Sequence, residues 1–161
     1  MEELYKSVQP KIYSFFYIKT LNKELAEDLT QEVFYNAVKG LSHFKGECSP
    51  ETWIFSIAKN LLKKQYRNHK YIGKLFEKLS VIEPINTFPE QLLLEKDEKR
   101  KLSELINNLE DSMKEIVILR IYGELSFAEI GQLVGKSENY ARVNYHRAKL
   151  KLQKDLEGYN G

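Results

Sequence analysis

The side chains best suited to chemistry stand in one stretch, SFAEIGQLVGKSENYARVNYHRAK, which runs from Ser126 to Lys149. Its second half carries arginine, asparagine, histidine and lysine between small apolar residues. In the major groove of DNA, arginine can pair with guanine, asparagine can pair with adenine, and an exposed valine can contact a thymine methyl group. The stretch therefore predicts contacts with DNA, and the alternative is a basic helix face that meets only solvent.

Two short helices joined by a tight turn would position these side chains. Ser126 can cap a first helix that runs through Val134. Gly135 can adopt the left-handed conformation that ends this helix, and Ser137 can cap the next one. Gly131 leaves no side chain where the second helix must cross the first. The spacing therefore predicts a helix-turn-helix.

The second helix of this motif has two different sides. At about 100° per residue, one stripe is small and apolar and should pack on its own bundle. This stripe consists of Ala141, Tyr145, Ala148 and Leu152. The other side carries the residues that we expect to face DNA, which are Asn139, Arg142, Val143, His146 and Arg147.

The formal net charge of +2 averages over three strongly charged segments. Segment 24–32 has four acidic residues and no basic one. Segment 59–78 has seven Lys and Arg residues against one acid, and segment 139–154 has five against none. Two separate basic helices suggest a polyanion that is contacted at two places, although a solvated face would show the same charge.

Several functional classes lack support in the sequence. No apolar run reaches the roughly 18 residues of a membrane span, and the start MEELYKSVQP lacks the pattern of a secretory signal, so we expect a cytoplasmic protein. The single cysteine, Cys48, can form no internal disulfide and cannot hold a zinc ion alone. His43, His69 and His146 stand outside known catalytic motifs. We therefore expect no catalytic residue, metal or cofactor.

Apolar residues recur at spacings of three and four throughout, which predicts an all-α chain. Asn22 should cap one helix, and Ser49 with Pro50 should begin another after a break at Gly46. We expect helices over about 2–19, 23–44, 50–70, 89–109, 112–122 and 126–134, followed by the C-terminal helix, with a possible short helix at 71–79. The organisation would be two small helical bundles, 1–70 and 95–161, joined by a flexible linker at 71–94, with the helix-turn-helix in the second bundle.

Three segments resemble the extracytoplasmic-function (ECF) group of bacterial RNA polymerase sigma factors. They read AEDLTQEVFYNAV, FKGECSPETWIFSIAKNLLKKQYR and LRIYGELSFAEIGQLVGKSENYARVNYHRAKLKL, and the resemblance covers nearly the whole chain. It implies a promoter-melting domain and a C-terminal helix-turn-helix domain. The protein would then direct core polymerase to promoters and open the duplex, without being an enzyme itself.

The resemblance implies that the acidic helix docks on the clamp helices of the polymerase β′ subunit. Periodicity places Leu25, Ala26, Leu29, Val33 and Ala37 on its buried side, with Glu24 exposed on the other. The expected docking residues are Asp28, Gln31, Glu32 and Tyr35. An acidic face of this kind suits a basic partner surface.

The loop from Phe44 to Pro50 and the helix after it would bind the melted minus-ten element. Unstacking a base costs a few kcal/mol, so melting needs a pocket for the base and basic side chains along the strand. The expected contacts are Lys45, Gly46, Glu47, Cys48, Ser56, Lys59, Asn60, Lys63 and Arg67, opposite a buried side formed by Ile54, Ile57, Ala58 and Leu61. Trp53 is expected to be a core residue, since large aromatic side chains usually serve packing.

The C-terminal helix would read the minus-thirty-five element through Ser137, Asn139, Arg142, Val143, His146, Arg147 and Lys149. The family's usual Leu-Pro before the preceding helix is Leu109-Glu110 here, which predicts a less firmly fixed helix start. The family's Ser and Arg in the recognition helix are replaced by Val143 and Asn144, so we expect a promoter preference particular to this chain.

The resemblance also implies partners beyond DNA. These are core RNA polymerase, through its β′ clamp helices and its β flap, and an anti-sigma factor that would often hold the protein at the membrane. Two other interpretations of the sequence remain open: the protein is a stand-alone helix-turn-helix regulator, or it is a helical module that binds only proteins.

Overall fold

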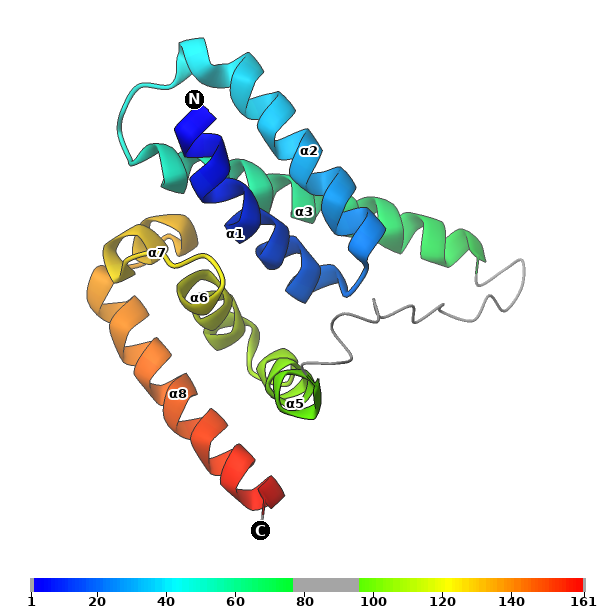
Figure 1. Ribbon diagram of the computed structural model, residues 1–161, viewed down its shortest axis with the longest axis vertical. Helices are drawn as coiled ribbons and strands as arrows, with labels where there is room; N and C mark the ends of the chain where they lie inside the picture. Colours follow the sequence, from blue (N-terminus) through cyan, green and yellow to red (C-terminus); the bar gives the residue numbers. More distant parts are fainter. Residues whose placement is uncertain (1, 77–95, 161) are drawn as a thin grey trace. The chain divides into compact units, whose positions relative to one another are not determined.

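The computed structural model describes residues 2–76 and 96–160, with side chains for 2–68 and 101–158. The chain divides into two units, Met1–Phe88 and Pro89–Gly161 (Figure 1). Every regular element among the described residues is a helix. The all-α prediction with two helical bundles is therefore confirmed.

The first unit consists of α1 (Glu2–Thr20), α2 (Lys23–Gly40), the short 3₁₀ helix η1 (Leu41–His43) and α3 (Pro50–Phe76). The helices α1 and α2 run antiparallel, and α3 packs against both (Figure 1). Only two residues join α1 to α2, and such short connections make sequential helices antiparallel neighbours.

The predicted start signals of α2 and α3 are confirmed. The Asn22 side chain accepts a hydrogen bond from the Leu25 amide at 3.1 Å. The Ser49 hydroxyl accepts one from the Thr52 amide at 3.1 Å. Pro50 occupies the first position of α3, where its missing N–H costs no hydrogen bond.

The core of the first unit lies where the three helices meet. Phe15 of α1 meets Phe55 of α3 edge to face, with ring centroids 5.9 Å apart. Burying a side chain of this size contributes about 1.5–3 kcal/mol. The completely or almost completely buried apolar residues are Val8, Ile12, Phe15, Phe16, Ile18, Ala26, Leu29, Val33, Ala37, Ile54, Phe55, Ala58 and Leu62.

Two helix ends differ from the prediction. α2 ends at Gly40 and continues as the single turn η1, whereas the sequence predicted one helix over 23–44. Gly40 has no side chain to hold the last turn, and tightening to a 3₁₀ helix is common at helix ends. α3 continues to Phe76, past the expected end at 70, so the first six residues of the predicted linker are helical. The remainder of that linker, and the start of the helix predicted from Pro89, lie outside the described residues.

The second unit contains α5 (Lys96–Asn107), α6 (Asp111–Ile121), α7 (Phe127–Val134) and α8 (Glu138–Asn160). α6 contacts the other three helices of this unit and buries four consecutive residues, Ile116 to Leu119. Four consecutive residues of an α-helix point to all sides of it, so this part of α6 is enclosed within the unit. The other buried apolar residues of the unit are Ile106, Leu109, Leu125, Ile130, Ala141, Ala148 and Leu152.

α6 begins directly after Leu109-Glu110, the pair that stands where the family usually has Leu-Pro. Glu110 has φ −56° and ψ 145°, which is the backbone conformation that a proline would fix. Its side chain makes no capping hydrogen bond. Unlike proline, Glu110 does not itself restrict φ, so the less firmly fixed helix start stays a prediction.

Candidate functional site

The predicted helix-turn-helix is formed by α7 and α8, and its turn is held as the sequence indicated. The Ser126 hydroxyl accepts from the Glu129 amide at 3.1 Å, while the Ser126 amide donates to the Glu129 carboxylate at 3.1 Å. This reciprocal pair is a capping box. Gly135 has φ +71°, and the Ser137 hydroxyl accepts from the Tyr140 amide at 3.0 Å.

Gly131 lies at the closest approach of the two helices. A Cβ atom at this position would stand 2.9 Å from the carbonyl oxygens of both Lys136 and Ser137. The Gly131 carbonyl itself accepts a hydrogen bond from the Lys136 amide at 2.9 Å. The prediction that no side chain fits at this crossing is therefore confirmed.

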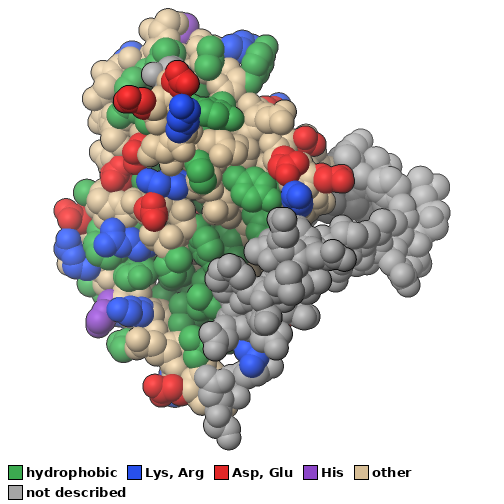
Figure 2. All heavy atoms as spheres, in the orientation of Figure 1, with side chains coloured by type: hydrophobic (Ala, Val, Ile, Leu, Met, Phe, Trp, Pro, Cys, Tyr) green, Lys and Arg blue, Asp and Glu red, His purple; other side chains and the backbone are tan. Residues whose placement is uncertain are grey.

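The two sides of α8 are arranged as predicted. Ala141 and Ala148 are fully buried, Leu152 is 5% exposed, and half-buried Tyr145 packs on Phe127, with ring centroids 5.5 Å apart. The seven residues expected to contact the minus-thirty-five element are all exposed: Ser137, Asn139, Arg142, Val143, His146, Arg147 and Lys149. In Figure 2, basic side chains lie along the exposed side of α8.

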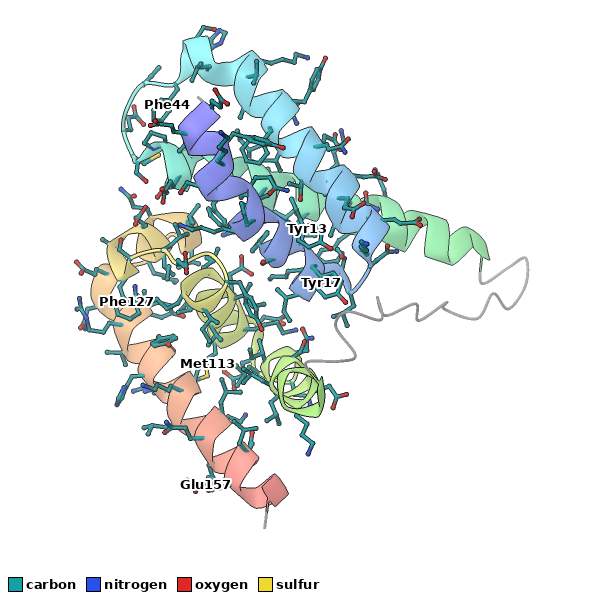
Figure 3. The ribbon with its side chains drawn as sticks, in the orientation of Figure 1. Tyr13, Tyr17, Phe44, Met113, Phe127 and Glu157 are labelled. Carbon is teal, nitrogen blue, oxygen red and sulfur yellow. The ribbon has the colours of Figure 1, made fainter. Side chains whose placement is uncertain are left out.

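Arg142 is held in place before any ligand arrives. Its guanidinium forms an ion pair with Glu138 one turn earlier, with an N–O distance of 2.8 Å. It also lies 5.5 Å from the centre of the Phe127 ring, whose position on α7 is labelled in Figure 3. Sequence reasoning did not include Glu138, although its spacing of four residues from Arg142 is a known signal for helical ion pairs.

Asn144, the other substituted position of the recognition helix, faces back along the helix. Its side-chain amide donates a hydrogen bond to the Tyr140 carbonyl at 2.9 Å. Val143, by contrast, is 37% exposed. The polar side chains that the family uses here are thus replaced by one exposed apolar group and one amide that bonds its own helix.

The acidic face of α2 is exposed as predicted. Asp28, Gln31, Glu32 and Tyr35 are all exposed, and the opposite side buries Ala26, Leu29, Val33 and Ala37, with Leu25 half-buried. None of the acidic residues on this face has a cationic partner among the described side chains. Tyr35 is 63% exposed, and Val38, which the sequence did not single out, is exposed to the same extent.

Thr30 is a second feature of α2 that the sequence did not reveal. It is 4% exposed and its hydroxyl donates to the Ala26 carbonyl at 2.6 Å. A buried threonine that bonds the preceding turn satisfies its own polar group, so it can stand in the buried stripe.

The loop between η1 and α3 is anchored by two aromatic rings. Phe44 packs on Trp53, with ring centroids 4.9 Å apart and an interplanar angle of 31° (Figure 3 labels Phe44). Trp53 is half-buried rather than a fully buried core residue, and a Cβ at Gly40 would lie 3.4 Å from its ring. Gly46 has φ +72°, a conformation that favours glycine.

The residues predicted to contact the minus-ten element differ in their exposure to solvent. Lys45, Gly46 and Glu47 are exposed, and Cys48 is half-buried. On α3, Asn60, Lys63 and Arg67 are exposed, whereas Ser56 and Lys59 are half-buried. The Ser56 hydroxyl donates to the Trp53 carbonyl, so it is already engaged within the helix.

The buried side of α3 is rotated from its predicted position by nearly one residue. Ile54 and Ala58 are buried as expected, but Phe55 and Leu62 join them, while Ile57 and Leu61 are only half-buried. The edge-to-face contact of Phe55 with Phe15 accounts for the rotation. As a result, Lys59 is half-buried, and Lys64 is exposed beside Lys63.

Other kinds of site receive no support from the described residues. Among them, no three His, Cys, Asp or Glu side chains come together as a metal ion would require. None of the described helices is long and apolar enough to span a membrane.

Comparison with known proteins identifies both units. Residues 4–71 match the family description "Sigma-70 region 2", and residues 99–152 match "Sigma-70, region 4". A stand-alone helix-turn-helix regulator would account for the second match and leave the first unexplained.

Individual relatives agree with this assignment over the whole chain. RNA polymerase sigma factor YlaC of Bacillus subtilis is 30% identical over 158 residues, which cover 97% of this chain and 91% of the relative. ECF RNA polymerase sigma factor SigX of the same organism is 23% identical, with 96% and 82% of the two chains covered.

Two solved structures share the fold. One is the sigma factor RpoE in complex with the anti-sigma factor NepR from Bartonella quintana, with a TM-score of 0.74, 19% identity, and coverage of 97% of this chain and 96% of that one. The other is CnrH in complex with the cytosolic domain of CnrY, with a TM-score of 0.66, 19% identity, and coverage of 98% and 84%. The chain therefore belongs to the sigma-70 family, among its extracytoplasmic-function sigma factors.

Proposed function

We propose that this protein binds core RNA polymerase through α2 and carries the polymerase to promoters that it reads through α3 and α8. The observation that carries the proposal is the division of surface charge between helices. The exposed acidic face of α2 has no cationic partner among the described residues, whereas α8 presents a basic face on a helix-turn-helix. One face suits a basic protein surface, and the other suits DNA.

Docking would use Asp28, Gln31, Glu32 and Tyr35 against the clamp helices of the polymerase β′ subunit, while the second unit would meet the β flap. Complementary charge speeds encounter and fixes the register of an interface. The exposed ring of Tyr35 would add apolar contact area, and aromatic side chains are enriched at protein interfaces.

Promoter opening would use the loop at 44–49 and the outward face of α3. Lys63 and Arg67 would follow the phosphates of the single strand, and the exposed stretch from Lys45 to Glu47 would border the unstacked base. The half-buried positions of Ser56 and Lys59 make them weaker candidates for direct contact. Lys64, exposed beside Lys63, joins the candidates.

Reading of the minus-thirty-five element would place α8 in the major groove. Arg142 is the candidate for reading a guanine, because arginine can pair with guanine at two positions, and such a contact provides about 1–3 kcal/mol of discrimination. To reach a base, its guanidinium must exchange Glu138 for DNA. Val143 would favour a thymine at the neighbouring position.

Transcription by purified core polymerase tests the proposal. Wild-type protein should direct initiation from its own promoter. Asp28→Lys should weaken binding to core polymerase at least about tenfold and leave folding intact, because this side chain is exposed. Glu3→Lys, an equal charge reversal on the exposed part of α1, is the matched control. Absence of transcription from every template, despite folded protein, would refute the proposal.

Arg142→Ala separates base reading from general attraction to DNA. Recognition of one base pair should weaken by about 1–3 kcal/mol, while binding to core polymerase stays unchanged. An equal loss on all DNA sequences would contradict a base-reading role.

An anti-sigma factor is a further proposed partner. One of the structural neighbours described above is the sigma factor RpoE in complex with the anti-sigma factor NepR, and the other is CnrH in complex with the cytosolic domain of CnrY. The exposed, unneutralised face of α2 would be covered in such a complex, and membrane attachment of the complex would depend on the anti-sigma factor. Its binding should compete with core polymerase for α2, which a three-component binding assay would measure.

A further inference from the structure

A small pocket lies along the seam between α1 and α2, beside the acidic face. Its α1 side is formed by residues spaced by four, which therefore share one side of the helix. The pocket has a volume of about 140 Å³ and is lined by Tyr5, Gln9, Tyr13, Glu27, Thr30 and Gln31. We call these six residues the seam pocket.

The size of the seam pocket indicates what it can hold. Sites that bury drug-sized ligands usually have about 300–1,000 Å³, so this pocket is smaller than a typical site of that kind. It is several times larger than the roughly 30 Å³ that one water occupies in the liquid. The end of one side chain from a protein partner fits this range.

The aromatic rings of the seam pocket are held by packing. The Tyr5 ring meets the ring of Phe34 of α2 edge to face, with ring centroids 4.7 Å apart. Tyr13 stacks on Tyr17 one turn later, with ring centroids 6.1 Å apart and an interplanar angle of 21°, and Figure 3 labels both rings on α1. Rings fixed in this way offer preformed faces, which lowers the entropy cost of binding.

The charge in the seam pocket is negative. Glu27 is its single ionisable carboxylate, it is exposed, and it has no cationic partner among the described residues. Burial is the first cause that raises the pKa of Tyr13, and the nearby charge of Glu27 raises it further. The carboxylate therefore acts on the interior of the pocket, where it would attract a cation.

We propose that the seam pocket receives an arginine side chain from the polymerase segment that docks on α2. This inference rests on the proposed function. The guanidinium would stack on the Tyr13 ring and pair with Glu27, while the amide oxygens of Gln9 and Gln31 would accept its remaining N–H groups. Gln31 lies on both the docking face and the pocket, so a segment docked on α2 would reach the pocket without leaving that face.

Arginine fits this lining better than lysine. Its planar guanidinium stacks on aromatic rings and presents five N–H donors in a fixed arrangement. The pocket supplies a ring face and three amide or carboxylate side chains, Gln9, Glu27 and Gln31, whose oxygens can accept hydrogen bonds. A lysine ammonium would use the carboxylate but would gain less from the planar faces.

Binding of the full chain to purified core RNA polymerase tests the inference. Glu27→Gln and Tyr13→Leu should each weaken binding about three- to tenfold, and the Glu27→Gln effect should shrink at high salt. Tyr13→Phe keeps the ring face, and Glu3→Gln removes an exposed α1 carboxylate outside the pocket, so both should stay within about twofold of wild type. Glu27→Gln changes an exposed side chain and remains decisive if Tyr13→Leu unfolds.

The outcomes distinguish this inference from the proposed function. If wild type binds and Asp28→Lys weakens binding, but Glu27→Gln binds like wild type, the seam pocket is overturned and docking on α2 stands. If wild type does not bind core polymerase, the proposed function falls and the inference falls with it.

Identity of the occupant needs a direct readout. In the variant Gln9→benzoylphenylalanine, the photoreactive side chain should crosslink to a segment of core polymerase. Mass spectrometry should identify an arginine in that crosslinked segment. A crosslinked segment without an arginine would overturn the assignment.

Discussion

Replacing Gly131 by alanine tests the helix-turn-helix geometry most directly. The added Cβ would lie 2.9 Å from two backbone carbonyl oxygens at the start of α8. This is about half an ångström short of ordinary contact, and backbone atoms cannot move aside as a flexible side chain would. The first turn of α8 must therefore shift relative to α7, at the place where α8 would enter the major groove.

The expected cost follows from two opposing terms. Overpacking of a closely packed site costs about 1–3 kcal/mol, and contact with fixed backbone belongs to the upper part of that range. Alanine is about 1 kcal/mol better than glycine inside a helix, which offsets part of this cost. We expect Gly131→Ala to destabilise the second unit by about 1–2 kcal/mol.

Hydrogen exchange of the α7 and α8 amides measures this unit without interference from the first one. Exchange should accelerate about five- to thirtyfold in Gly131→Ala. Gly158→Ala is the matched control, because nothing lies within 4 Å of its added Cβ, and it should exchange as slowly as wild type or more slowly. Equal protection in Gly131→Ala and wild type would refute the close-crossing argument.

Three further predictions concern other parts of the chain. Glu110→Pro should stabilise the second unit by about 0.4–1 kcal/mol in urea unfolding, because the backbone already has proline-like angles; a loss of stability would show that the preceding residue is incompatible. Glu138→Gln should strengthen binding to arbitrary DNA in mobility-shift assays, because it removes a negative charge and releases Arg142; unchanged binding would contradict this restraint. Burial raises the pKa of Tyr13 above 10.0, so folding favours the neutral form of this side chain. The stabilisation linked to the neutral form should be complete below pH 10 and should decrease above it. Thermal unfolding of wild type and of Tyr13→Phe should therefore differ in pH dependence only above pH 10.

The features that the sequence predicted well are those determined by neighbouring residues. Asn22, Ser49 and Ser126 cap helices through hydrogen bonds that span only a few residues. Gly135 takes the left-handed conformation because no other residue adopts it at so little cost. The exposed sides of α2 and α8 follow from helical periodicity, which is also a local property.

The features that the sequence did not predict depend on contacts between helices. The buried side of α3 is set by Phe55 packing on Phe15, forty residues away in the chain, so periodicity within α3 placed it nearly one residue off. The change from α2 to η1 accompanies the packing of Trp53 over Gly40. In both cases the local sequence pattern allowed more than one helix rotation or helix end, and packing against a neighbouring helix selected one of them.

The placement of the two proposed DNA-binding faces on separate units has a consequence for affinity. A single small DNA-binding module buries about 600–1,000 Å² of its surface on DNA, whereas larger specific interfaces bury up to about 2,500 Å², so α3 and α8 together would contact more DNA than either helix alone. Docking of α2 on core polymerase would make the second contact intramolecular once the first has formed, which raises its effective concentration. On the proposed function, tight promoter binding therefore belongs to the complex with polymerase. The unneutralised acidic face of α2 would oppose binding of the free protein to the DNA phosphates, because like charges repel, and docking on a basic polymerase surface would remove that opposition.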